Sequence, residues 1–278
     1  MRKAPVNKII PFSVVDGIGN RTSIFLQGCN IHCGYCHNPE TQRMCTHCGK
    51  CVEDCPVQAL YIEEGKVCWD AIKCVQCDHC IAVCPYFASP KIRFMDAAEV
   101  FEEVEKGIPF IRGITVSGGE CMLYPEFLTE LFKMAKEHGL TCFADSNGTV
   151  DFSEYPSLLE CCDGVMLDVK SWQEDVYQAL TGGLNQTVKK NLRLLAELGK
   201  LEELRIVCLP GQVDAKEAIE GIRETIPDQV GAVKLKLIMF RNFGVKGRFA
   251  ELESPSREYM EELKQCALAA GFQKIIIT

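Results

Sequence analysis

The chain has 278 residues, of which 47% are hydrophobic and 24% charged, a composition typical of folded globular proteins rather than disordered or fibrous ones. Its formal charge of −8 argues against a nucleic-acid partner, because phosphate binding needs a clustered basic surface. The length allows one large α/β domain, or one such domain with a small insert.

The N-terminal segment is basic, but Pro5, Pro11 and Asp16 interrupt its apolar runs, so it is a poor signal peptide. No uninterrupted apolar stretch reaches the ~18 residues that a membrane-spanning helix needs. We therefore expect a cytoplasmic protein without a membrane partner. In a reducing compartment, 18 cysteines favour metal or redox chemistry over a disulfide scaffold, which is typical of much smaller chains.

The first predicted strand is TSIFLQG, residues 22–28, and three cysteines follow it directly. Cys29, Cys33 and Cys36 are spaced C-x3-C-x2-C, with no fourth cysteine at a matching distance. Three thiolates on a four-iron cluster leave one iron open, and an open metal position is how a site admits a substrate or cofactor. The spacing therefore predicts a catalytic [4Fe-4S] cluster on these three residues.

The next segment, residues 42–91, is dominated by cysteines in an internal repeat at an offset of 29 residues. Each copy reads C-x2-C-x2-C-x3-C-P, the run of bacterial ferredoxins, in which the fourth cysteine ligates the other cluster. We therefore predict two further [4Fe-4S] clusters, and we expect bound metal to hold this insert folded. A pair of structural zinc sites is the alternative. The predicted ligand sets are Cys45, Cys48, Cys51 with Cys84, and Cys74, Cys77, Cys80 with Cys55.

From about residue 92 onward, short β-branched runs alternate with amphipathic segments of helical period. The runs are residues 113–119, 140–148, 163–170, 203–211, 233–240 and 272–278. Strands separated by helices predict a parallel sheet, and six or so such units predict an α/β fold of the partial (β/α)6 TIM-barrel type. A doubly wound open sheet is the alternative. The predicted domains are the barrel, residues 1–41 and 92–278, and the ferredoxin-like insert, residues 42–91.

Polar residues gather where these strands end. SGGE, residues 117–120, ends one strand, at the edge where barrel enzymes build their sites, although a tight turn is the simpler interpretation. Met166, Asp168 and Lys170 share one face of another strand, where a plain salt bridge is the alternative. The seven other cysteines are predicted to pack in the interior, namely Cys68, Cys121, Cys142, Cys161, Cys162, Cys208 and Cys266.

The segment CNIHCGYCHNP resembles the cluster loop of radical S-adenosylmethionine (SAM) enzymes, and the whole layout resembles glycyl-radical-enzyme activating enzymes with a two-cluster insert. The resemblance covers nearly the full chain, with VDGIGNR, YCHNP, SGGE, DSNG, MLDVK and RIVCLPG in family order. It implies a reduced cluster that donates one electron to SAM. The resulting 5′-deoxyadenosyl radical then takes hydrogen from a backbone glycine of a partner, a glycyl radical enzyme.

The resemblance also implies the residues of the cofactor site and the partners. A flavodoxin or ferredoxin is the expected electron donor, and a monomer is expected. A monovalent cation, Na⁺ or K⁺, is expected on Asp145, Ser146, the Met166 backbone and Asp168. For Arg205, an arginine paired on the surface is the alternative. The implied SAM-binding residues are Tyr35, Ser117, Gly118, Gly119, Glu120, Asp145, Ser146, Asp168, Lys170 and Arg205.

The chain departs from the family pattern at two positions. Ile18 stands where members commonly have proline, and Arg241 stands where they commonly have a cofactor-contacting histidine. Two other functions remain open at this point. A plain iron–sulfur electron carrier would explain the insert but not the Cys29 site, SGGE or MLDVK. A radical SAM enzyme acting on a small molecule or a ribosomal peptide is opposed only by the family-like flanks VDGIGNR and YCHNP.

Overall fold

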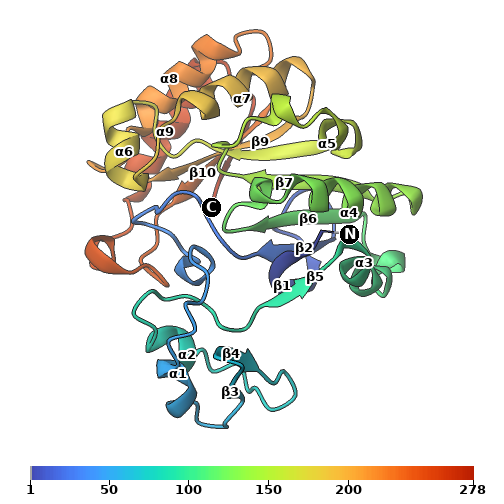
Figure 1. The fold of residues 1–278 in the computed structure, drawn as a ribbon. Helices are drawn as coiled ribbons and strands as arrows, with labels where there is room; N and C mark the ends of the chain where they lie inside the picture. Colours follow the sequence, from blue (N-terminus) through green and yellow to red (C-terminus); the bar gives the residue numbers. More distant parts are fainter. Residues whose placement is uncertain (1) are drawn as a thin grey trace.

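The computed structural model describes residues 2–278, and its main feature is one nine-stranded sheet (Figure 1). Seven of its strands run parallel and lie side by side in chain order. They are β2 (Arg21–Leu26), β6 (Gly113–Gly118), β7 (Thr141–Ser146), β8 (Gly164–Asp168), β9 (Leu201–Cys208), β10 (Lys234–Met239) and β11 (Lys274–Ile277). All seven coincide with predicted strands.

Two strands that the sequence analysis did not predict complete the sheet. β1 (Ala4–Ser13) pairs antiparallel with β2, and β5 (Arg93–Met95) pairs antiparallel with β1. The sheet therefore runs from β11 at one edge to β5 at the other, and it is an open, partial relative of the TIM barrel. The doubly wound alternative is wrong, because the parallel strands follow one another without the reversal of order that defines that fold.

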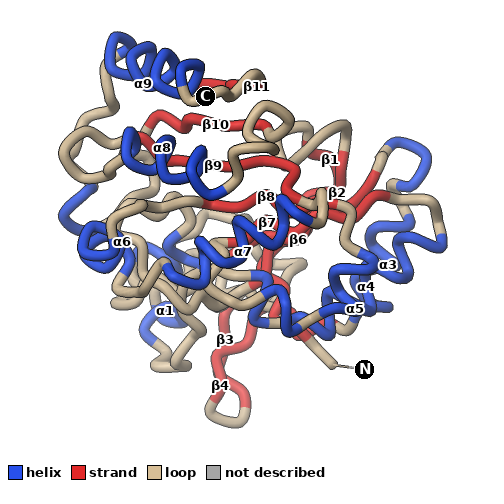
Figure 2. Tube along the Cα trace, turned by 90° about the horizontal axis from the view of Figure 1, so that it is seen from above, coloured by secondary structure: helices blue, strands red, loops and turns tan. Residues whose placement is uncertain are grey.

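Helices cover the outer face of the curved sheet (Figure 2). Contacts join α3 to α4, α4 to α5, α7 to α8, and α8 to α9. The predicted amphipathic segments correspond to α4, α7, α8 and α9. The bounds are α3 (Ala97–Glu105), α4 (Pro125–Glu137), α5 (Pro156–Cys161), α6 (Glu174–Thr181), α7 (Gln186–Glu197), α8 (Ala215–Thr225) and α9 (Arg257–Ala269). Within residues 2–278, no helix is both long and apolar enough to cross a bilayer.

The core between sheet and helices follows from the helical period. On α4, for example, Phe127, Leu128, Leu131 and Phe132 recur at three and four residues, and all four are buried. Five of the seven cysteines predicted to pack in the interior are buried, namely Cys121, Cys142, Cys161, Cys162 and Cys208, whereas the prediction is wrong for Cys68 and Cys266, which are only partly buried. Short 3₁₀ turns link the elements at Pro39–Thr41, Ile108–Phe110, Cys121–Leu123, Phe152–Glu154 and Gly247–Phe249.

The cysteine-rich segment forms a separate small unit, at the bottom of Figure 1. It contains α1 (Lys50–Glu53), the hairpin of β3 (Leu60–Glu63) and β4 (Lys66–Trp69), and α2 (His79–Ala82). Its own hydrophobic cluster is formed by just three buried residues, Cys51, Leu60 and Val67. Such a small apolar core agrees with the expectation that bound metal stabilises this unit.

The backbone of this unit repeats as the sequence does. His47 and Gln76 both have positive φ angles, of 57° and 55°, and they lie inside the first C-x2-C of each run. Gln58 and Phe87, each three residues after the fourth cysteine, have φ angles of 52° and 55°. Residues other than glycine seldom adopt this conformation, so its recurrence at the same offset shows that the two copies fold alike.

Candidate active site

The carboxyl ends of the parallel strands and the loop after β2 surround one cavity. Cys29, Cys33 and Cys36 line it from the loop, which we call the cluster loop (residues 27–38). From the strand ends, the cavity is lined by eight of the predicted cofactor residues: Ser117, Gly118, Gly119, Asp145, Ser146, Asp168, Lys170 and Arg205. Residues spread over more than 170 positions of the chain thus meet at the edge where barrel enzymes carry their chemistry.

The cluster loop is held in place by backbone hydrogen bonds to the end of α6. The amides of His32 and Gly34 donate to the carbonyls of Thr181 and Leu180, at 2.8 and 2.9 Å. These are carbonyls of the last helical turn, which have no partner within the helix itself. Gly34 also lies against the ring of Phe249, so close that a Cβ at this position would stand 2.3 Å from it. The loop therefore has little freedom to move.

Gly118 and Gly119 allow a close approach, but to the protein's own backbone. The amide of Gly119 donates to the carbonyl of Leu26 at 2.9 Å, and the amide of Glu120 donates to that of Gly28 at 2.8 Å. A Cβ at Gly118 would lie 2.1 Å from the Leu26 carbonyl oxygen. These glycines thus join the end of β6 to the start of the cluster loop, in addition to lining the cavity.

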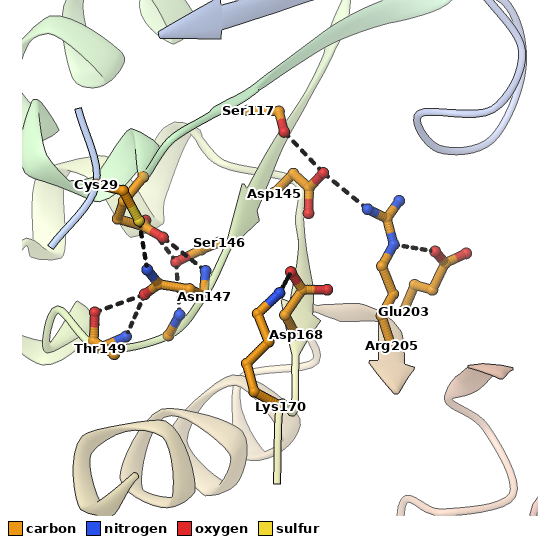
Figure 3. Close-up of polar contacts among 12 residues, drawn as sticks. Cys29, Ser117, Asp145, Ser146, Asn147, Thr149, Asp168, Lys170, Glu203 and Arg205 are labelled. Carbon is orange, nitrogen blue, oxygen red and sulfur yellow. Dashed lines mark hydrogen bonds and ion pairs between the residues drawn. The ribbon is translucent and has the colours of Figure 1, made fainter. Parts of the chain in front are cut away.

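Arg205 joins two buried carboxylates at the end of β9. Its Nη1 lies 2.8 Å from Asp145 Oδ2, and its Nε lies 2.7 Å from Glu203 Oε1 (Figure 3). Its side chain is only 11% exposed, so the interpretation of Arg205 as a surface residue is wrong. Burial opposes its charge, but Asp145, Asp168 and Glu203 outweigh this effect and raise the pKa of Arg205 above its ordinary value. Burial raises the pKa of Asp145, because it disfavours the charged carboxylate, and the positive charge of Arg205 opposes that shift.

Lys170 and Asp168 form the second ion pair of the cavity, with 2.5 Å between Nζ and Oδ2 (Figure 3). Burial disfavours the ammonium, but the carboxylate of Asp168 outweighs it, and the pKa of Lys170 lies well above its ordinary value. The salt bridge expected from the sequence is present. Because both residues also line the cavity beside the cluster loop, the pair faces whatever the cavity binds.

Two predicted site residues lie behind the cavity wall. Glu120 is buried and accepts hydrogen bonds from the Ser146 hydroxyl and from the amides of Met122 and Asn147, at 2.7 to 2.9 Å. Burial raises the pKa of Glu120 to about 7. The sulfur of Met166 lies 3.0 Å from Arg205 Nη2. Both side chains therefore support cavity residues instead of lining the cavity themselves.

Two residues of this site were not singled out from the sequence. The side-chain amide of Asn147 lies 3.7 Å from Cys29 Sγ and donates to Asn30 Oδ1 at 3.1 Å, so it ties the end of β7 to the cluster loop. It belongs to the quoted DSNG motif, which was a sufficient signal. Glu203 stands two residues before Arg205 on the same strand face, and that spacing could have revealed the pair.

The two departures from the family pattern lie in different places. Ile18 is exposed, in the loop between β1 and β2. Arg241 is exposed too, and its backbone carbonyl lies 2.8 Å from Nε2 of His37, a residue of the cluster loop that lines the cavity. The imidazole of His37 thus lies beside residue 241, where family members commonly have a histidine, although His37 comes from another part of the chain.

The cavity suits an iron–sulfur cluster with an organic ligand. In the protein alone, burial raises the pKa of Cys29 to about 11 and that of Cys33 to about 12, so the thiolates need the positive charge of bound metal. The hydroxyl of Tyr35, which also lines the cavity, is buried and has no hydrogen-bond partner within residues 2–278. A buried hydroxyl without a partner is costly, and a ligand could satisfy it.

In the insert, some members of each predicted ligand set lie near one another. Cys55 of the first run lines one small cavity with Cys74, Cys77 and Cys80 of the second run. In the other set, burial raises the pKa of Cys45, and the charge of Cys84 is a further cause, which reflects their proximity. Across residues 2–278, no three His, Cys, Asp or Glu side chains converge as they would around a single metal ion.

Comparison with known proteins identifies the family. The sequence profile of the Radical SAM superfamily matches residues 23–221. The chain is 30% identical to the trans-4-hydroxy-L-proline dehydratase activating enzyme of Clostridioides difficile, over 94% of each chain. It is 30% identical to the indoleacetate decarboxylase activating enzyme of Tractidigestivibacter scatoligenes, over 99% of this chain and 97% of that one.

Among solved structures, Streptococcus suis SuiB bound to its precursor peptide SuiA is similar in fold, with a TM-score of 0.55 and 12% identity. The match covers 91% of this chain and 47% of SuiB, and it supports the partial barrel alone. The sequence relatives are more specific, since they match over nearly the whole chain. The chain belongs to the radical SAM superfamily and, within it, to the glycyl-radical-enzyme activating enzymes.

Proposed function

We propose that this activating enzyme holds its catalytic [4Fe-4S] cluster on Cys29, Cys33 and Cys36 and binds SAM in the cavity beside them. When bound, the reduced cluster supplies one electron to SAM, whose cleavage gives methionine and the 5′-deoxyadenosyl radical that takes hydrogen from a glycine of the partner enzyme. The observation that carries this proposal is that the three cysteines and the polar strand ends line one cavity.

The residues of the chain would fix the cofactor by charge and hydrogen bonds. Ser117, Gly118 and Gly119 would contact the amino group of SAM at the end of β6. The ion pair of Asp168 and Lys170 offers both signs of charge to a zwitterionic ligand, and its burial strengthens such contacts. Arg205 would act by holding Asp145 in place, and Glu120 by fixing the turn that carries Ser146 and Asn147.

The insert would carry two auxiliary clusters with cross-shared ligands, as in ferredoxins. The small cavity shared by Cys55 and the three cysteines of the second run supports the set formed with Cys55. The proximity of Cys45 and Cys84 supports the other set. Iron analysis of the anaerobically reconstituted protein should then give about twelve iron atoms per chain, as follows from four per cluster.

A monovalent cation, Na⁺ or K⁺, remains part of the proposal. Asp145 and Asp168 supply carboxylate oxygens on neighbouring strands, and hard oxygen ligands suit such an ion. In this structure Arg205 and Lys170 already balance both carboxylates, and the Ser146 hydroxyl donates to Glu120. A cation would therefore have to bind together with SAM, and SAM affinity should then rise with added K⁺ or Na⁺ at constant ionic strength.

The protein substrate would itself close the cavity. A primary radical abstracts hydrogen indiscriminately, so the target glycine must come within roughly 3–3.5 Å of the 5′ carbon and water must be kept out. The partial barrel leaves the sheet open between β11 and β5, which gives a peptide loop a route inward. We further propose that the enzyme works as a monomer with a flavodoxin or ferredoxin as electron donor.

Isotope transfer tests the function. The reduced enzyme alone should form deoxyadenosine slowly, the partner should stimulate this reaction, and deuterium placed at the target glycine should appear in the deoxyadenosine. A stable glycine-centred radical should be detected on the partner by electron paramagnetic resonance. Deuterium arriving from a small molecule instead, with no radical on the partner, would refute the activating role but leave SAM cleavage intact.

A further inference from the structure

A groove of about 290 Å³ reaches the cluster loop from outside the barrel, between the insert and the loop that follows β10. We call it the basic groove. It contains two of the three cysteines of the cluster loop together with cationic and aromatic side chains from three separate segments. The residues that line the basic groove include Cys33, Cys36, Arg43, Tyr86, Phe87 and Lys246.

The cations of the basic groove are available to a partner. Arg43 and Lys246 are exposed, and within residues 2–278 neither forms an ion pair with an acidic side chain. Instead, Arg43 lies 5.6 Å from the ring centre of Tyr86, and Lys246 lies 5.4 Å from that of Phe87. The chain as a whole carries a charge of −8, which repels an acidic protein. The local positive surface of the basic groove would therefore attract such a protein to this place.

The groove and the active-site cavity lie on two sides of the same cysteines. Cys33 and Cys36 line both, whereas the cofactor residues of the strand ends line only the cavity. A hydrogen atom must be delivered in contact with the 5′ carbon, so the glycine has to enter the cavity. An electron needs only a nearby redox centre, and a centre seated in the groove would reach the cluster without disturbing bound SAM.

The groove also adjoins the insert. Arg43 precedes Cys45 by two residues, and Tyr86 follows Cys84 by two residues, both of these cysteines belonging to one proposed auxiliary cluster. A redox protein docked in the groove would therefore stand near this cluster as well as the catalytic one. Aromatic rings beside exposed cations are typical of protein interfaces, and electron-transfer encounters are usually small and steered by charge.

We propose that the basic groove is the docking site of a small acidic electron-transfer protein of the flavodoxin type, steered there by Arg43 and Lys246. This inference rests on the proposed function, which requires a reduced cluster. One electron passes from the reduced flavin of the donor to an oxidised cluster. The flavin, an anionic hydroquinone, is thereby oxidised by one electron to the neutral semiquinone without loss of a proton, and the cluster is reduced by one electron.

A double charge reversal tests the docking site. Arg43→Glu/Lys246→Glu is compared with Lys133→Glu/Arg193→Glu, which changes the net charge equally at exposed positions on α4 and α7. A purified acidic flavodoxin is titrated against each protein by flavin fluorescence, and the rate at which its reduced form reduces the clusters is followed by anaerobic stopped flow. Arg43→Gln/Lys246→Gln gives a milder variant in case charge reversal disturbs folding.

In the groove variant, the association constant and the second-order rate should fall about tenfold or more at low salt, the range of electrostatic steering. High salt should lower the wild-type rate similarly, and the control variant should stay within about twofold of wild type. Reduction by dithionite, and SAM cleavage after it, should be unchanged in the groove variant.

The docking site would be overturned if flavodoxin binding and the reduction rate fell equally in the groove variant and the control variant, or fell in neither. So would a groove variant that binds flavodoxin normally but no longer transfers the radical under dithionite, since the groove would then serve the glycyl partner. If dithionite-reduced wild type fails to cleave SAM, the proposed function falls, while the binding comparison still decides the docking site.

Discussion

The contact between the end of β6 and the cluster loop can be tested with one added methyl group, in the substitution Gly119→Ala. A Cβ at Gly119 would lie 2.1 Å from the carbonyl oxygen of Gly28 and 2.7 Å from that of Thr41. Real Cβ atoms essentially never come closer than 3.0 Å, and both obstacles are backbone atoms. The cluster loop would therefore have to move away from β6 by about 0.9 Å or more.

The size of the effect follows from what this movement breaks. Overpacking typically costs about 1–3 kcal/mol. The two backbone hydrogen bonds that join the segments, at 2.9 and 2.8 Å, are each worth roughly 0.5–1.5 kcal/mol. The free energy of unfolding should therefore fall by about 2–6 kcal/mol. Because Cys29 follows Gly28 directly, the catalytic cluster should also bind less completely and SAM affinity should fall.

Urea unfolding of the metal-free protein, under anaerobic reducing conditions, measures the loss of unfolding free energy. Iron content and the resonance signal of the SAM-bound cluster measure the binding of the cluster and of SAM. Gly107→Ala is the matched control, because its Cβ would have ordinary contacts of 3.5 Å with Phe12 and Val104. It should leave both readouts near wild type. A Gly119→Ala protein within about 0.5 kcal/mol of wild type, with a normal cluster signal, would refute the reasoning, since this is the range of neutral surface changes.

Three further predictions concern the proposed site. Cys36→Ala should abolish SAM cleavage, whereas Cys48→Ala should lose iron yet keep some cleavage with a strong artificial reductant; equal loss in both would contradict the division into catalytic and auxiliary clusters. Asp168→Ala and Lys170→Ala should each weaken SAM binding about tenfold or more, as expected for a charged hydrogen bond, with the catalytic cluster retained. Unchanged affinity in cofactor titrations of both variants would reduce the pair to a structural salt bridge. Arg205→Leu should destabilise the protein by about 3–5 kcal/mol in urea unfolding, because it leaves the buried carboxylate of Asp145 without its cationic partner, whereas Glu203 keeps Lys234 and Lys236; a loss below about 1 kcal/mol would show that Asp145 is solvated.

Much of the site could be predicted because its signals are local. The spacings of Cys29, Cys33 and Cys36, and of the two ferredoxin runs, are properties of short segments, and the motifs SGGE and MLDVK lie at the ends of strands with clear β patterns. The structure brings the Cys29 loop, SGGE and MLDVK to one edge of the sheet, as parallel strands require, while the ferredoxin runs lie in the separate small unit (Figure 1). The missed strands β1 and β5 lack such a signal, since Pro5 and Pro11 interrupt the first and the second has only three residues.

The direction of individual side chains was less predictable. Glu120 belongs to a motif read as cofactor-binding, but its carboxylate turns away from the cavity. It accepts hydrogen bonds from Ser146 and Asn147 at the end of β7 and from the amide of Met122 in its own turn. Arg205 could have been a surface residue. Glu203, two residues before it on β9, and Asp145, at the end of β7 and far away in the sequence, together hold it inside. Such preferences depend on atoms far away in the sequence.

The sequence by itself determined the cysteine spacings and the alternation of strands and helices, and hence the family and the presence of a parallel sheet, but not the order of all its strands. These are consequences of short-range periodicity and of covalent spacing, which act before any tertiary contact forms. Only the tertiary structure decided which strand ends share a cavity wall, how the end of α6 holds the cluster loop, and that Arg43 and Lys246 meet beside the same cysteines. Those arrangements depend on the curvature and register of the sheet, because contacts between distant segments are selected by packing and by the need to pair every buried polar group.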